Sequence, residues 1–329
     1  MDKDRIIGII KKFSGRRIAV VGDLALDTYV YGSITRLNPE SAAPLITIED
    51  GKEEYKLGCA ANVALNSSSL EAKVDLYGAV GNDDGGKMIN KLCLDHGISF
   101  VEVKEGKTII KQRFIDKSHK HHYLMRADFG ESNLNQMSNK SENILYGEFF
   151  RNTKEYEGVI LSDYNKRVLR GDLGPKVIAL ADELGIKSIV DPKPLNNFIA
   201  FRGTTLVRPN LSEARAIVGK NNLNDEELAL HLKEIMQSDG VVITCGSEGA
   251  FVYDCGFYHI PTKAREVVDV TGAGDTFTAA LMLSFLSGAS IMEAAHIANH
   301  AAGIVVEKPG TASLTQQELI ERILHEDSH

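Results

Sequence analysis

Short apolar runs alternate with longer helical patterns along most of this chain. The runs are rich in Val and Ile, which is typical of strands buried on both faces of a parallel sheet. They cover residues 17–21, 74–80, 158–162, 187–191, 205–208 and 240–244. Stretches with helical spacing lie between them, at 60–69, 85–95, 138–151, 175–184, 212–218 and 226–238. Strands separated by helices predict an α/β fold with a mainly parallel central sheet and helices on both faces.

Two segments break this alternation. Residues 29–49 and 108–126 each read as a pair of strands in period two, without a helix between the strands. We expect them to form a small antiparallel sheet outside the main one, as a lid. A length of 329 residues with 43% hydrophobic content fits one large α/β domain or two modest ones. We predict one domain over residues 1–329, with the lid inside it.

Polar side chains follow five of the predicted strands. They are Asp23, Asp163, Asp191, Asn210 and Thr244. In an open parallel sheet, ligands bind outside the carboxyl ends of the strands, so a site is expected there. Each residue alone could simply end a strand or cap the next helix. Five together favour a binding site.

A seven-residue string, Asp-Val-Thr-Gly-Ala-Gly-Asp, runs from Asp269 to Asp275 and precedes a long apolar stretch. The small residues Gly272, Ala273 and Gly274 therefore open a helix. Its free N–H groups and its dipole make an anion site. A carboxylate at Asp275 could accept a proton from a substrate hydroxyl while the N–H groups stabilise a transferred phosphoryl group. The simpler alternative is a helix that begins after a glycine turn.

Composition narrows the possible partners. The net charge is −8 and no basic tract stands out, so nucleic acid and anionic membrane surfaces are not expected partners. The four cysteines match neither a zinc site nor a disulfide framework, and free thiols are expected. Neither a signal peptide nor a membrane span is recognisable. These features favour the cytoplasm.

The string that ends at Asp275 resembles the C-terminal signature Asp-Thr-x-Gly-Ala-Gly-Asp of ribokinase-like (PfkB-type) sugar kinases. The resemblance extends from about residue 16 to about residue 315. It implies a ribokinase-like three-layer fold and an ATP-dependent carbohydrate kinase. It also implies that Asp275 is the catalytic base and that Gly272, Ala273 and Gly274 form the anion hole.

Further matches to this family concern the nucleotide. Thr244, Gly246 and Gly249 resemble its nucleotide-binding turn. Asn210 and Glu213 resemble its Asn-x-x-Glu element, which implies that both contact ATP-bound Mg²⁺ through water. The alternative for this pair is a helix cap.

Late in the chain, Asn299 lies in a stretch that resembles the adenine side of the family's nucleotide site. Asp269, Thr271 and Gly310 imply a K⁺ site by resemblance. The histidines at 119, 121 and 122 are expected to form a solvated tip, with metal binding as the alternative.

The N-terminal matches concern the sugar. Gly58 and Asn62 resemble the family's Gly-Gly-Ala-x-Asn signature, with Cys59 in place of the second glycine. Because Cys restricts φ, the turn or the pocket could differ from that of the family. Asp23 and Asp27 fit the family's acceptors for sugar hydroxyls.

Within the family, the chain most resembles bacterial D-glycero-β-D-manno-heptose 7-phosphate kinases. This implies phosphorylation of the anomeric O1 to the 1,7-bisphosphate, for nucleotide-heptose in lipopolysaccharide or surface glycans. A substrate phosphate needs a cation, and Lys193 is the preferred candidate beside Lys111, Arg113 and Arg126. Many relatives carry a fused C-terminal nucleotidyltransferase. Since the chain ends at His329, a kinase-only form is expected.

Other functions stay open. The chain could phosphorylate another sugar or sugar phosphate, such as ribose, fructose or fructose phosphate. It could also be a non-catalytic ribokinase-like regulator, although an intact Asp275 argues against that. A Rossmann dehydrogenase is excluded, because no Gly-x-Gly-x-x-Gly follows the first strand. The family often pairs its lid sheets, so a homodimer is expected.

Overall fold

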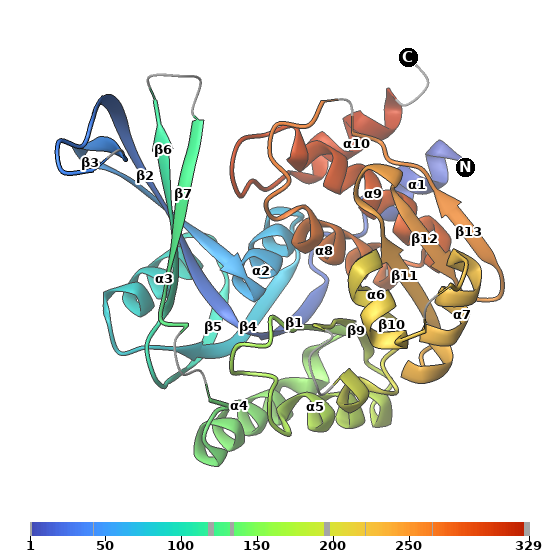
Figure 1. Cartoon of the computed structure of the whole chain (residues 1–329). Coiled ribbons are helices and arrows are strands. Elements are labelled where there is room, and N and C mark those ends of the chain that lie inside the picture. Colours follow the sequence, from blue (N-terminus) through green and yellow to red (C-terminus); the bar gives the residue numbers. More distant parts are fainter. Residues whose placement is uncertain are drawn as a thin grey trace.

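A central sheet runs through the protein, as a computed structural model shows (Figure 1). The structure describes residues 2–41, 43–117, 122–131, 135–193, 198–220, 222–264 and 266–325. The side chains at 119 and 121–122, predicted to form a solvated tip, lie outside what is described. Over the described residues the sheet is nine-stranded. Its strands are, in spatial order, β13 (Phe257–Ile260), β12 (Ala250–Tyr253), β11 (Gly240–Thr244), β10 (Leu206–Val207), β9 (Lys187–Asp191), β8 (Gly158–Ser162), β1 (Arg17–Gly22), β4 (Lys73–Val80) and β5 (Ser99–Lys104).

The sheet is mainly parallel, as predicted. All pairings from β11 to β5 are parallel, and only the β11–β12 and β12–β13 pairings of the described sheet are antiparallel. The predicted strands all occur, although β10 is only two residues long. The hydrophobic pattern missed β5, β12 and β13, together with the first and last helices. Only Val103 of β5 is buried and the other side chains are partly buried or exposed, so this strand lacks the continuous apolar run of an inner strand.

Helices cover both faces of the sheet. Alternate residues of β1 show the division: Ile18 and Val20 join one hydrophobic core, and Ala19 and Val21 join the other. The first core contains α1 (Lys3–Ile10), α2 (Ala60–Ser69), α3 (Asp84–Asp95), α8 (Ala273–Leu286), α9 (Ile291–Val306) and α10 (Gln316–Leu324). The second contains α4 (Asn139–Asn152), α5 (Leu173–Glu183), α6 (Leu211–Val218) and α7 (Asp225–Met236). This three-layer α/β arrangement confirms the predicted fold class.

Three short 3-10 helices occur among the described residues, η1 (Thr153–Glu155), η2 (Phe198–Phe201) and η3 (Gly246–Glu248). No helix in the described ranges is long and apolar enough to cross a bilayer.

A second, smaller sheet rises from one end of the main sheet (Figure 1). Its strands are, in order, β3 (Pro44–Cys59), β2 (Leu24–Leu37), β6 (Ile109–Asp116) and β7 (His122–Phe129). The predicted lid exists, but its predicted bounds are too narrow. The first seven residues of β2 are all buried, so they continue the apolar pattern of β1 and hide the period-two signal. The lid is also mixed rather than antiparallel, because β2 and β6 run parallel.

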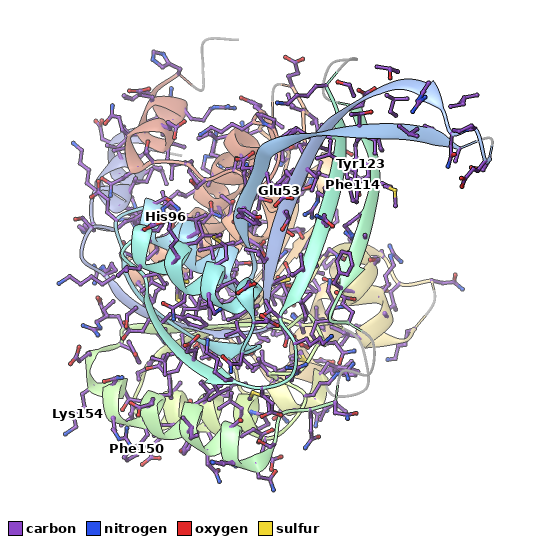
Figure 2. All side chains as sticks on the ribbon, turned by 90° about the vertical axis from the view of Figure 1, so that its left-hand side faces the viewer. Glu53, His96, Phe114, Tyr123, Phe150 and Lys154 are labelled. Atoms are coloured by element: carbon purple, nitrogen blue, oxygen red, sulfur yellow. The ribbon has the colours of Figure 1, made fainter. Side chains whose placement is uncertain are left out.

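One face of the lid is directed at the end of the main sheet. The register places Lys56 and Lys111 on either side of Asp27, and Arg113 beside Tyr29. These residues share a face because they lie an even number of positions apart on each strand. Figure 2 looks onto the lid from outside, with Phe114 on β6, Tyr123 on β7 and Glu53 on β3.

Candidate active site

Helix α8 begins at the predicted anion turn. Gly272 is its N-cap, with φ 82° and ψ 0°, a left-handed conformation that favours glycine. A Cβ atom at Gly272 would lie 2.7 Å from Nδ2 of Asn62. The turn therefore needs glycine both for its backbone and for the close approach of Asn62. Asp275 follows in the first turn of the helix.

Both oxygens of Asp275 accept hydrogen bonds from protein side chains. Nδ2 of Asn62 donates to Oδ2 at 2.8 Å, and the hydroxyl of Tyr164 donates to Oδ1 at 2.8 Å. Only 6% of Asp275 is exposed. Burial raises its pKa above the ordinary value, and the two hydrogen bonds offset part of this effect because they stabilise the charged form. Asp275 is therefore a proton acceptor that is largely shielded from water.

The amide of Asn62 is oriented by a chain of hydrogen bonds between α2 and α8. Nδ2 of Asn66 donates to Oδ1 of Asn62 at 3.2 Å, and the hydroxyl of Thr276 donates to Oδ1 of Asn66 at 2.8 Å. Since Oδ1 of Asn62 already accepts, its Nδ2 group faces Asp275. All four residues are buried. Asn62, predicted on the sugar side, therefore also holds the candidate base.

Asp23 lies at the end of β1, as expected, but its carboxylate holds a loop. It accepts four backbone N–H groups, from Tyr164 at 3.1 Å, Lys166 at 2.9 Å, and Arg167 and Val168 at 2.8 Å each. Only 1% of Asp23 is exposed. In this arrangement it positions the segment that carries Tyr164, rather than presenting a free acceptor to a sugar.

Asp27, the second predicted sugar acceptor, is paired with the lid. Nη1 of Arg113 lies 2.8 Å from its Oδ1, and the hydroxyl of Thr311 donates to its Oδ2 at 3.2 Å. A Cβ atom at Gly58 would lie 3.1 Å from Cγ of Asp27, so a small residue there makes room for the carboxylate. Tyr29 completes the group, with its hydroxyl 2.8 Å from that of Thr311.

Cys59, the departure from the family signature, adopts a backbone conformation that suits glycine. Its φ is 57° and its ψ is −134°, a combination that residues with a Cβ atom rarely adopt. Nζ of Lys111 donates to its sulfur at 3.2 Å. Burial raises the pKa of the thiol to about 12, so the thiol is neutral. Cys59 therefore has a strained backbone conformation, because its Cβ atom restricts φ as predicted.

A small polar pocket of about 160 Å³ lies beside Asp275 and the anion turn. Lys193 and Glu213 form an ion pair in it, as do Arg208 and Asp191. Burial raises the pKa of Asp191 to about 7, although Arg208 opposes the shift. The pocket thus combines two cations with several carboxylates around the N-terminus of α8.

Asn210 and Glu213 form a helix cap, which is the alternative to a magnesium role that the sequence left open. Oδ1 of Asn210 accepts the N–H of Glu213 at 2.9 Å, and Oε2 of Glu213 accepts the N–H of Asn210 at 2.9 Å. Both residues also line the polar pocket. Their oxygen atoms fit a hydrated Mg²⁺, which prefers oxygen ligands and retains water.

A larger, mostly apolar cleft of about 460 Å³ adjoins the polar pocket. The two share Arg208, Asn210 and Gly274. All the predicted nucleotide residues line the cleft, namely Asn210, Thr244, Gly246, Gly249 and Asn299. Gly246 and Gly249 have φ of 56° and 97°, which favours glycine in this turn.

The three residues predicted for K⁺ lie together. Oδ1 of Asp269 accepts the N–H of Thr271 at 2.9 Å, and Oδ2 accepts the N–H of Gly310 at 3.0 Å. Both oxygens of this carboxylate accept backbone N–H groups, and the carboxylate is the oxygen ligand of the three residues that fits a hard cation.

The structure thus brings nearly every predicted residue to one end of the sheet. Sequence reasoning assigned no role to Tyr164, Thr311 or Arg208. The partner of Tyr164 lies 111 positions away in the sequence, and those of Arg208 lie 17 and 36 positions away, so no local pattern points to these contacts. Arg126 lies opposite Arg113 in the register of the lid and pairs with Asp128, with Nε 2.7 Å from the carboxylate, so its role beside a substrate phosphate stays a prediction.

The chain is similar in sequence to known proteins. The family model described as pfkB family carbohydrate kinase matches residues 17–318. Bifunctional protein HldE of Actinobacillus pleuropneumoniae serotype 5b (strain L20) is 35% identical over 322 residues, or 96% of this chain. Bifunctional protein HldE of Haemophilus influenzae (strain PittEE) is 36% identical over 320 residues, or 95% of this chain. The chain spans only 65% and 64% of the length of these two relatives.

Solved structures share the fold. Arabidopsis thaliana ribokinase, complexed with ribose and ATP, has a TM-score of 0.71 at 19% identity, over 94% of this chain and 99% of that one. Phosphofructokinase-2 from Escherichia coli, in complex with potassium, has a TM-score of 0.77 at 17% identity, with the same coverage of both chains.

Proposed function

This chain belongs to the pfkB family of carbohydrate kinases, and we propose that it transfers the γ-phosphoryl group of ATP to a sugar hydroxyl. One observation carries the proposal. The carboxylate of Asp275 lines the polar pocket at the N-terminus of α8, directly after Gly274, which lines both this pocket and the apolar cleft. A base, an anion site and two ligand spaces are therefore adjacent.

In the proposed reaction, the cleft holds the adenosine part of ATP, with Asn299 beside the adenine. Thr244, Gly246 and Gly249 form the turn along the phosphates. The free N–H groups of α8, in the turn of Gly272 and Gly274, receive the transferred group. Oδ1 of Asp275 accepts the proton as the sugar oxygen bonds to the γ-phosphorus, and ADP leaves as its bridging bond breaks.

The polar pocket supports the charge of the phosphates. Lys193 and Arg208 place two cations beside the anion turn. Glu213 and Asn210 would hold Mg²⁺ through water, and the ion would neutralise phosphate oxygens when bound. Asp269, Thr271 and Gly310 would hold K⁺ next to the same turn.

The proposed acceptor is D-glycero-D-manno-heptose 7-phosphate, phosphorylated at its anomeric O1 to the 1,7-bisphosphate. The product would serve nucleotide-heptose synthesis for lipopolysaccharide or surface glycans. The similarity to the HldE proteins over 95–96% of the chain supports this choice. The cationic lid face also supports it, because Lys56, Lys111 and Arg113 lie together around Asp27 and Tyr29 on one face of the lid and suit a phosphorylated sugar.

Two variants and a substrate panel test the proposal. Asp275→Asn is expected to abolish ADP release while ATP affinity stays within about twofold, since the amide cannot accept the proton. Asp182→Asn, an exposed carboxylate on α5, is the matched control and should behave as the unaltered protein. Full activity of Asp275→Asn would remove the base from the proposal.

The substrate claim is tested separately, with a coupled ADP-release assay on heptose 7-phosphate, ribose, fructose and fructose 6-phosphate. We expect kcat/KM to be highest for heptose 7-phosphate by at least about tenfold, which corresponds to roughly 1.4 kcal/mol of transition-state binding. A preference for another sugar would identify that sugar as the substrate instead, and the kinase assignment would remain in place.

We also propose a homodimer that forms through the lid. The outward side chains of Met125 and Phe129 on β7 are about half exposed, at 56% and 51%, and they lie opposite Phe114 and Ile110 of β6, on the face of the lid that Figure 2 views. Light scattering on the protein and on a Met125→Lys variant tests this. A monomer in both would contradict it.

A further inference from the structure

The hydroxyl of Tyr164 is hydrogen-bonded to the oxygen atom of Asp275 that a substrate would use. Asn62 holds Oδ2 from within the protein core, so Oδ1 is the oxygen that faces the polar pocket. The phenol of Tyr164 donates to that oxygen at 2.8 Å, in the same sense in which a sugar hydroxyl would donate. Burial beside Asp275 raises the pKa of Tyr164 well above its ordinary value, so the phenol keeps its proton.

The ring of Tyr164 is held by both the lid and the main sheet. It packs against the small apolar cluster of Ala25, Cys59 and Ile109 at the base of the lid. Nζ of Lys111, on β6, lies 5.2 Å from the ring centroid, and Nζ of Lys193, after β9, lies 5.5 Å from it. Cations at such distances are attracted to the ring. The phenol is therefore placed on Asp275 by contacts that do not involve Asp275.

A carbohydrate kinase has to discriminate against water. If water reached Oδ1, its oxygen could bond to the γ-phosphorus while Asp275 took its proton and the bridging bond to ADP broke. The products would be ADP and inorganic phosphate, without a phosphorylated sugar. Small water cannot be rejected by size, so the site needs another means to keep it from the base.

We propose that Tyr164 is a positioning residue that guards Asp275 against water, by keeping its hydroxyl on Oδ1 until a sugar displaces it. A sugar would be held at several points by the lid, so it can replace one phenolic hydrogen bond. A water molecule has no such additional contacts. This inference rests on the proposed role of Asp275 as the base.

The test is ATP hydrolysis in the absence of any sugar. Tyr164→Phe removes only the hydroxyl and keeps the ring between the two lysines. We expect its hydrolysis of Mg²⁺–ATP to rise about tenfold to a hundredfold, the range that one hydrogen bond to a charged group represents. The KM for the sugar should fall, because a competitor for Oδ1 is removed. Rates are expressed per ATP-binding site, counted by nucleotide titration, so that any loss of folded protein cancels.

Tyr77→Phe is the matched control. Tyr77 is fully buried and its hydroxyl lies 2.6 Å from that of Tyr156, away from the site, so hydrolysis should not change. Unchanged hydrolysis in Tyr164→Phe, with a lower kcat for the sugar, would show that the phenol only orients the base and would overturn the guard.

The double variant Tyr164→Phe/Asp275→Asn separates this inference from the proposed role of Asp275. If Asp275 is the base, the added hydrolysis disappears in the double variant, which supports the guard. If the added hydrolysis persists, Asp275 is not the base, and its assignment as base fails together with the guard. Because no sugar is present, an error in the proposed acceptor affects neither result.

Discussion

Replacing Cys59 by glycine should stabilise the protein relative to replacing it by alanine. Cys59 has φ 57° and ψ −134°, and it joins β3 to α2. Residues with a Cβ atom held in such a region cost about 1–3 kcal/mol. Alanine keeps the Cβ atom and glycine does not, so the two variants differ mainly in this strain.

The opposing effect is the freedom of glycine in the unfolded chain, which costs roughly 0.5–1 kcal/mol. The difference leaves Cys59→Gly more stable than Cys59→Ala by about 0.5–2 kcal/mol. Unfolding entropy is about 2.1 cal/mol/K per residue, or roughly 0.7 kcal/mol/K for 329 residues. The glycine variant should therefore melt about 1–3 °C above the alanine variant.

The assay is thermal unfolding by circular dichroism under reducing conditions, since the described cysteines are all free thiols. Cys93 supplies the control, because it is also fully buried but lies inside α3. There alanine should be more stable than glycine by about 1 kcal/mol, the ordinary helix preference. If alanine is also the more stable residue at Cys59, the reasoning from backbone strain is wrong.

Three further predictions concern the base, the anion turn and the distant core. Burial raises the pKa of Asp275, so kcat/KM should fall, as pH is lowered, at a pH above that of an ordinary carboxyl group. A fall at the pH of an ordinary carboxyl group would contradict this. In Tyr164→Phe, which loses a hydrogen bond to the carboxylate, the fall should move to higher pH, and a profile that coincides with that of the unaltered protein would contradict this second statement. Gly272→Ala should lower kcat by on the order of 10²-fold, because its Cβ atom displaces the amide that donates to the base. Gly288→Ala, with φ 93° and nothing within 4 Å of the added atom, should lower stability without changing kcat. Tyr156→Phe removes a 2.6 Å hydrogen bond to a buried carboxylate on β4 and should cost about 1–3 kcal/mol in urea unfolding, with KM unchanged.

Most of the fold was predictable because its strands are buried on both faces. Such strands appear as continuous apolar runs, and β1, β4, β8, β9 and β11 all do. The lid was harder to delimit. Half of β2 is as buried as β1, so the pattern does not show where the main sheet ends and the lid begins.

The site was predictable where the chemistry is local. The turn from Gly272 to Asp275 lies within four residues, and the cap formed by Asn210 and Glu213 is equally local. The capping alternative for that pair was a correct description of its hydrogen bonds, and it does not exclude contact with a hydrated ion. The role of Tyr164 was not predictable, because it lies 111 positions from Asp275 and its segment carries no signal of that contact.

Asp23 explains why a carboxylate at a strand end cannot be identified as a ligand from its position alone. It follows a buried strand, as a ligand would, but four backbone N–H groups satisfy its oxygens. A carboxylate with so many donors is stabilised in its charged form and needs no substrate to complete its hydrogen bonding. The donors belong to the loop after β8 that carries Tyr164. Asp23, at the end of β1, therefore positions the loop, and the loop in turn places Tyr164 on Asp275. The contacts of Asp23 are to backbone N–H groups, which nearly every residue type has. A pattern of side chains cannot encode such contacts, so they become visible only when β1 and β8 are seen side by side.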